Sequence, residues 1–98
     1  MSDEARPPVA YKTTPEFDEK SLPAAIRSAH STKAGVWGLL RVLEGEVDLV
    51  FHNPQSVVRA TSTCPALIAP DAVHHVETLG PMRLRVEFYR ERPAEGAP

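Results

Sequence analysis

Cysteine is nearly absent from this sequence of 98 residues, which has only Cys64. A single thiol excludes an internal disulfide and a four-cysteine zinc site, so we expect Cys64 to be a small buried hydrophobe at the start of a strand. No run approaches the ~20 apolar residues that cross a membrane, and the acidic amino terminus has no apolar stretch of the secretory type. These absences predict a soluble, cytoplasmic protein with no membrane partner.

An excess of positive charge is also missing. The net charge is −2 and the basic residues are interspersed with acids, which argues against nucleic acid as a partner. There is no glycine-rich phosphate loop, nucleophile elbow or Cys-x-x-Cys pair, so we expect no nucleotide cofactor. The hydrophobic share of 42% is typical of a globular chain. A chain this short supports one domain with a modest core, and we therefore expect a homodimer.

Short strands separated by turn residues dominate the middle of the chain. Residues 1–8 and 91–98 are rich in proline, alanine and charge, which predicts a disordered arm and a disordered tail around a domain at residues 9–90. Apolar or alternating runs predict strands at residues 24–30, 36–43, 46–51, 56–61, 65–69, 73–79 and 82–89. This spacing predicts an all-β fold, and we expect a single small β-barrel.

Two local patterns are especially clear. Gly45 separates two β-favourable runs, and because glycine accepts the positive φ of tight turns, we expect these runs to form a hairpin. The last strand alternates strictly, which predicts one buried face made of four residues: Met82, Leu84, Val86 and Phe88.

Four blocks of the sequence resemble a known family in the right order. The central block runs from residue 34 to residue 46 and contains the turn Leu43-Glu44-Gly45-Glu46. The others are residues 27–30, 70–77 and 85–89. Together they resemble the small cupins, in particular the TehB/YeaR-like domain associated with tellurite resistance. The resemblance implies a jelly-roll barrel of the cupin type. Some relatives carry the domain ahead of a methyltransferase, and since this chain ends near residue 98 we expect no S-adenosylmethionine chemistry here.

The central block departs from metal-binding cupins. Their usual glutamate falls at Gly38, and their usual pair of histidines falls near Thr32 and Ala34. Only His74 lies where the resemblance implies a second-block ligand, and His30 is the nearest candidate for the first block.

We therefore predict a divalent metal, such as Zn, Fe or Ni, held by His30 and His74 with Glu87 as the carboxylate ligand. Neutral imidazole and carboxylate bind such ions and leave positions open for a substrate. Glu77 is the second candidate carboxylate. The alternation of the last strand places Glu87 opposite the apolar face, so it lines a pocket only if the apolar face packs elsewhere; otherwise it forms a cross-strand pair with arginine.

Other polar residues have a site role and a structural role as alternatives. His75 is expected to face solvent on the side opposite His74, His52 is expected to be exposed, and Trp37 is expected to anchor the core. The guanidinium groups of arginine match the geometry of oxyanions, so we also expect a small anionic ligand, bound by Arg41, Arg83 and Arg85. The alternative is that these three arginines are ordinary surface residues.

Three functions remain open on the sequence. The first is a metal- or small-ligand-binding protein in stress or oxyanion (tellurite-like) tolerance, with no defined catalysis. The second is a metal-dependent cupin enzyme, an oxygenase or isomerase acting on a small polar substrate. The third is a structural or regulatory dimer module.

Overall fold

The computed structural model describes residues 8–95, so most of the predicted arm (1–8) and the end of the predicted tail (91–98) lie outside the described residues. Eight strands and one short helix follow the order β1 (Lys12–Thr13), β2 (Phe17–Asp18), α1 (Ala24–Arg27), β3 (Trp37–Glu44), β4 (Glu46–His52), β5 (Gln55–Thr61), β6 (Ala66–Ile68), β7 (His74–Thr78) and β8 (Arg83–Tyr89). None of the described helices is long and apolar enough to span a membrane.

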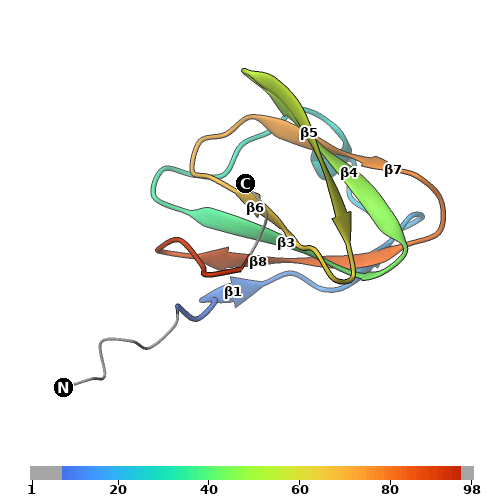
Figure 1. The fold of residues 1–98 in the computed structure, drawn as a ribbon, viewed down its shortest axis with the longest axis horizontal. Coiled ribbons are helices and arrows are strands. Elements are labelled where there is room, and N and C mark those ends of the chain that lie inside the picture. The colour runs from blue at the N-terminus through green and yellow to red at the C-terminus, as the bar shows by residue number, and fades with distance from the viewer. Residues whose placement is uncertain (1–7, 96–98) are drawn as a thin grey trace.

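The strands form two sheets that face each other (Figure 1). The five-stranded sheet has the order β1-β8-β3-β6, with β2 also paired to β8, and the three-stranded sheet has the order β5-β4-β7. The all-β class is confirmed. The closed barrel is not, because no strand ladder in the described chain joins the two sheets into one. The homodimer stays a prediction.

The pairings nest around the middle of the chain. β4 pairs with β5, β3 with β6, the segment at His30 with His74 at the start of β7, and β1 with β8, always antiparallel. Successive pairs fall in alternate sheets, so the chain resembles one long hairpin rolled up on itself. As a result, residues far apart in the sequence meet between the sheets.

Gly45 is a corner between the sheets and not the turn of a hairpin. β3 belongs to the five-stranded sheet and β4 to the three-stranded sheet, so the predicted hairpin is wrong. The β3–β8 register shifts between Val42 and Glu44, and Gly45 follows at φ 74°. A bulge bends and twists its strand, which together with the positive φ directs the chain into the other sheet.

The core lies between the sheets. The predicted apolar face of the last strand is confirmed, because all four of its residues contribute to the main hydrophobic cluster: Met82, Leu84, Val86 and Phe88. The opposite face of the five-stranded sheet has a smaller cluster of Leu39, Leu67 and Tyr89, against which Trp37 packs as expected.

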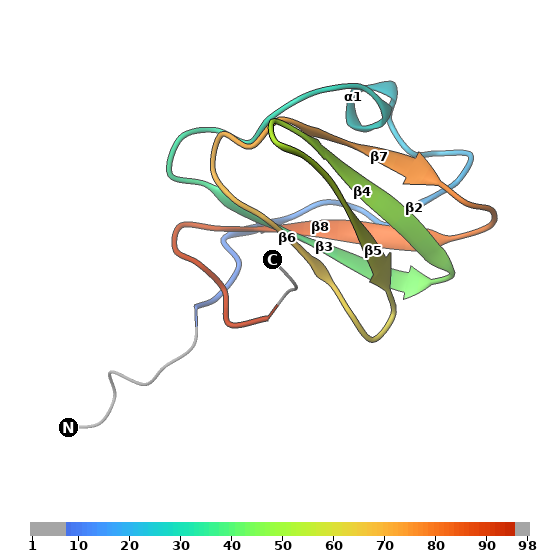
Figure 2. The same ribbon diagram turned by 45° about the horizontal axis from the view of Figure 1, so that its top comes forward.

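Two local predictions are wrong. Residues 24–30 are not a strand, because they form helix α1 and then extend to a single β-bridge at His30, beside the start of β7 (Figure 2). The only hydrogen bonds of this segment to the sheet are the two with His74, too few for a ladder. Cys64 is exposed rather than buried, because it lies in the tight connection after β5.

Candidate functional site

His30 and His74 come together in the structure. Their backbones exchange two hydrogen bonds, His30 N–H to the His74 carbonyl at 3.0 Å and His74 N–H to the His30 carbonyl at 2.8 Å. The two rings lie on the same side of this bridge, with centroids 4.1 Å apart. The nested pairing thus joins two histidines that no local motif connects.

Hydrogen bonds select the tautomer of both rings. Nδ1 of His30 lies 2.9 Å from the Ser28 carbonyl oxygen, and Nδ1 of His74 lies 2.7 Å from the Ala72 carbonyl oxygen. A carbonyl oxygen only accepts, so each Nδ1 carries the proton. In the neutral state each ring therefore has Nε2 as its acceptor nitrogen.

Burial favours the neutral form of His74. The residue is 2% exposed, and its loss of hydration lowers its pKa, with smaller contributions from the nearby histidines. The hydrogen bond to Ala72 acts in the opposite direction but does not reverse the shift. His74 thus offers an unprotonated Nε2 under conditions in which a free histidine is partly charged.

The pair lines a small cavity between the sheets. The cavity has a volume of about 70 Å³, and Thr14 and Thr32 are the only other polar residues among its lining. The remaining walls are apolar: Ile26, Leu40, Ile68, Val76, Val86 and Phe88. It is a small, mostly apolar cavity that the two histidines line.

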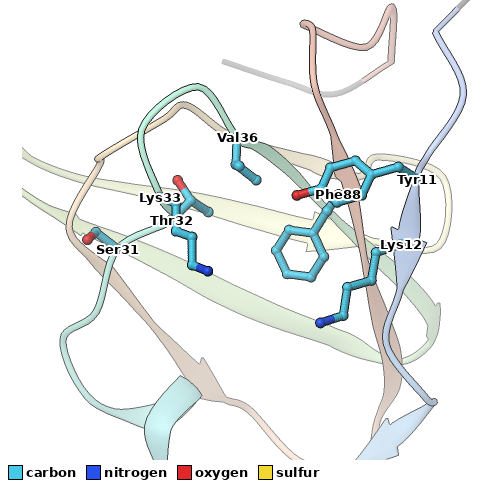
Figure 3. Close-up of a pocket in the computed structure, with 7 residues that line it drawn as sticks. All are labelled: Tyr11, Lys12, Ser31, Thr32, Lys33, Val36 and Phe88. Atoms are coloured by element: carbon cyan, nitrogen blue, oxygen red, sulfur yellow. The ribbon is translucent and has the colours of Figure 1, made fainter.

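A second, open pocket of about 220 Å³ lies beside this cavity and shares Thr32 and Phe88 with it. Lys12 and Lys33 extend toward it from opposite sides, with the Phe88 ring between them (Figure 3). Neither lysine forms an ion pair with any residue in the described range. The pocket therefore presents two unneutralised positive charges at the mouth of the histidine cavity.

Glu87 lies on the other face of its strand, as the alternation indicated. Its carboxylate accepts hydrogen bonds from Arg41, Arg85 and Tyr89 at 2.9–3.3 Å. It therefore does not join His30 and His74. Within residues 8–95, no group of three His, Cys, Asp or Glu side chains is arranged to hold a metal ion.

The surroundings of Glu87 keep it ionised. Burial raises the pKa of its carboxyl group, but hydrogen bonds from Arg41, Tyr89 and Arg85 outweigh burial and hold the pKa below its usual value. Burial, together with the hydrogen bond to Glu87, raises the pKa of Tyr89. The cluster is a satisfied polar network on the outer side of the sheet.

The predicted arginine set does not gather at one anion site. Arg41 and Arg85 bind Glu87, and Arg41 also binds Glu95 at 2.7 Å. Arg83 pairs with Glu16 and Glu44 instead. These guanidinium groups are engaged by carboxylates of the chain itself.

Lys12 and Lys33 were missed by the sequence reasoning. Each is one basic residue in a mixed segment, and nothing local indicates that the two lie across one pocket. His52 is exposed as predicted, and His75 lies on the face opposite His74 as predicted, but it is half-buried rather than open to solvent. The Glu77 carboxylate is 2.8 Å from His75 rather than beside His74.

Comparison with known proteins relates this architecture to one family. Residues 12–86 match the family model of the TehB-like domain. Two proteins of Haemophilus influenzae are 32% identical (strain 10810) and 30% identical (strain Rd) to the chain over 76 residues, and both are named probable S-adenosyl-L-methionine-dependent methyltransferase TehB. Each match covers 72% of this chain but only 27% of the relative, so the chain spans about a quarter of the length of the curated relatives it matches.

Solved structures agree with the fold. The crystal structure of TehB from Haemophilus influenzae superposes with a TM-score of 0.75 at 28% identity, over 85% of this chain and 31% of that chain. A crystal structure of a protein from Escherichia coli strain K12 has a TM-score of 0.77 at 20% identity, over 86% of this chain and 91% of that chain, which shows the fold alone.

These relatives correct two predictions. The predicted function, a metal- or ligand-binding protein without defined catalysis, is wrong, and so is its alternative, a metal-dependent oxygenase or isomerase. The matched relatives are instead named as methyltransferases. The expected divalent metal (Zn, Fe or Ni) is wrong for the same reason, because the names of these relatives point to S-adenosylmethionine and not to a metal as the cofactor. The His30, His74 and Glu87 set also lacks the geometry of one metal centre, since Glu87 faces away from the two histidines.

Proposed function

The chain belongs to the TehB-like domain family, and from that membership we propose that it serves S-adenosylmethionine-dependent methyl transfer as the module that binds the methyl acceptor. The observation that carries this proposal is the small cavity lined by His30 and His74, whose Nδ1 atoms are bound by backbone carbonyls so that Nε2 is the acceptor nitrogen of each neutral ring.

The histidine cavity does not fit the methyl donor. The enclosed cavity has about 70 Å³, whereas sites for ligands of drug-like size have roughly 300–1,000 Å³. S-adenosylmethionine also carries a positive sulfonium, which the lysines at the cavity mouth repel. We therefore assign the histidine cavity to the acceptor and not to the donor.

The cavity and its mouth suit a small, oxygen-rich acceptor. Lys12 and Lys33 attract an anion to the mouth, where charges are partly screened by salt. Inside, a protonated oxyanion donates its hydroxyl to Nε2 of His30 or His74, and the hydroxyls of Thr14 and Thr32 are additional partners. Tellurite, the oxyanion associated with the family name, is the natural probe.

We further propose that the two sheets form a reduced jelly roll of the cupin type. A jelly roll has eight strands arranged in two Greek keys. The four nested pairings of this chain match that plan, with the single bridge at His30 in place of one full strand. This strand arrangement supports the acceptor site, because it brings segments that are distant in the sequence together between the two sheets.

Titration of the chain with tellurite and, separately, with S-adenosylmethionine tests the acceptor assignment. We expect tellurite to shift the ring NMR signals of His30 and His74 saturably, and S-adenosylmethionine to leave them unchanged. The Lys12→Gln/Lys33→Gln variant should weaken tellurite binding, and it should also remove most of the salt dependence. Lys20→Gln, an exposed lysine outside the pocket, is the matched control.

Two results would overturn the proposal. One is saturable binding of S-adenosylmethionine to the chain at the histidine cavity. The other is tellurite binding that is equally strong in the double lysine variant and in Lys20→Gln, because a surface effect would not distinguish them.

A further inference from the structure

The three-stranded sheet carries a hydrogen-bonded chain of two histidines and a carboxylate on its outer face, away from the cavity. Nε2 of His52, at the end of β4, lies 2.7 Å from Nδ1 of His75 on β7. Nε2 of His75 lies 2.8 Å from the Glu77 carboxylate. The two rings meet edge to face with centroids 4.9 Å apart.

The carboxylate gives this chain a direction. Ionised Glu77 only accepts hydrogen bonds, so Nε2 of His75 carries a proton. Neutral His75 then has Nδ1 as its acceptor, and Nε2 of His52 must donate to it. The free lone pair at the outer end is Nδ1 of His52. A base oriented by a second group, itself held by a carboxylate, is the arrangement that activates nucleophiles in acyl transfer.

A surface pocket of about 290 Å³ adjoins this end of the chain. Val50 supplies an apolar wall, and Gln55 supplies an amide that can donate to a developing oxyanion. The other lining residues are Phe51 and the two histidines, His52 and His75.

The charges on this face select against anions. Besides Glu77, the outer side carries Glu46 and Asp48 on β4, and Arg59 on β5 pairs with both of them. Asp48 is directly opposite Glu77 in the β4–β7 register. Three carboxylates against one guanidinium give a negative surface, so the pocket suits a small uncharged molecule.

We propose that His52, His75 and Glu77 form a general-base site that hydrolyses small uncharged esters with water. His52 Nδ1 takes a proton from water, the Nε2 proton of His52 passes to Nδ1 of His75, and the resulting imidazolium lies beside Glu77. The water oxygen bonds to the ester carbonyl carbon. When the bond from that carbon to the alcohol oxygen breaks, the protons move back and the alcohol leaves protonated. His52 is the catalytic base, and His75 and Glu77 are positioning residues. The site lies on the opposite face of the sheet from the acceptor cavity and does not depend on it.

Hydrolysis of p-nitrophenyl acetate by the full chain tests this activity. We expect a rate above that of an equal concentration of free imidazole, and His52→Ala should reduce it to that level or below. Glu77→Gln should lower the rate by about tenfold or more, since positioned general bases contribute roughly 10²–10⁴-fold. Glu46→Gln removes a carboxylate from the same face but not from the hydrogen-bonded chain, and should keep the rate. An unchanged rate in His52→Ala, or equal losses in Glu46→Gln and Glu77→Gln, would overturn the proposal.

Nitrogen-15 NMR of the imidazole rings separates positioning from mere stability. In the neutral chain we expect both His52 and His75 to be protonated at Nε2, with the preference at His75 weakened in Glu77→Gln and kept in Glu46→Gln. Neutral His52 protonated at Nδ1 would contradict the direction of the hydrogen-bonded chain.

Discussion

Glu87 shows how the environment of a single residue decides its role. The alternation of the last strand places its side chain on the outer face correctly, but it does not indicate that the residue is only 7% exposed. Burial follows from Tyr89 on the same strand and from Arg41 on β3, which meet the carboxylate from two directions. A carboxylate with this many donors is a structural ion and has no open position for a ligand.

Glu87→Gln should destabilise the chain by about 2 kcal/mol, because hydrogen bonds to a charged group contribute roughly 1.5–3 kcal/mol, Arg85 loses its counter-ion and Arg41 keeps only Glu95. Urea denaturation measures the change. Glu44→Gln, whose side chain is 64% exposed and pairs with Arg83, is the matched control and should change stability far less. Equal losses of unfolding free energy in the two variants would show that the hydrogen bonds of Glu87 stabilise the chain no more than an exposed ion pair does.

Because the pKa of His74 is lowered in the folded chain, we expect the stability of the chain to depend on pH. Its pKa in the folded chain is lowered from 6.5 by burial, so below about pH 6.5 the unfolded chain binds more protons than the folded one. The free energy of unfolding is therefore fully retained above that pH and falls as the pH falls below it toward the lowered pKa. Urea midpoints from about pH 7.5 to about pH 5.5 measure this loss, in a window above the titration of carboxylates. In His74→Phe the slope should flatten, and an equal slope in both proteins would contradict the assignment.

At the scale of strands and turns, the sequence predicted most elements and misjudged their connections. Period-2 alternation identified the last strand because one face is in the core and the other is not. The same local reasoning treated Gly45 as a hairpin turn, because a positive φ permits a hairpin and a sheet-to-sheet corner equally well. The choice depends on which strand pairs with β3, and β8 and β6 take both of its edges. That pairing is not encoded near Gly45.

Gly45→Ala tests the corner. Both Gly45 (φ 74°) and Gly35 (φ 76°) have positive φ, but a Cβ at Gly45 would overlap the Pro81 carbonyl oxygen and approach Met82, whereas a Cβ at Gly35 meets nothing. Gly35→Ala should therefore cost only the left-handed conformation, about 1 kcal/mol, and Gly45→Ala about 3 kcal/mol or more. Thermal or urea unfolding gives both values. Similar losses at the two positions would mean that the corner relaxes without cost.

At the scale of the whole molecule, the candidate site exists only because the chain is rolled up. His30 and His74 were predicted as a pair from the family resemblance, and the nested pairing does bring them together. Glu87 was grouped with them because a metal needs a third ligand, yet its strand directs it to the other face. Lys12 and Lys33 come from segments that the sequence leaves unremarkable, and only their positions across one pocket make them a feature. The residues of the site were thus predictable where the family resemblance or an alternation places a side chain, and not where two distant segments without such a signal meet.

Because the main core cluster draws on both sheets, the two sheets should unfold together. Leu84 on β8 and Leu49 on β4 are both fully buried in that cluster, one from each sheet. Truncating either to alanine should cost about 2–5 kcal/mol and shift one shared transition, whether it is followed by Trp37 fluorescence on β3 or by hydrogen exchange of β4. Val57→Ala on β5, where the residue is 56% exposed, is the control and should leave the transition nearly in place.

If Leu49→Ala lowered the stability of the three-stranded sheet while the fluorescence transition stayed unchanged, the sheets would be separate units. The cavity between them would then open without global unfolding, and His74 would lose the burial that holds its imidazole neutral.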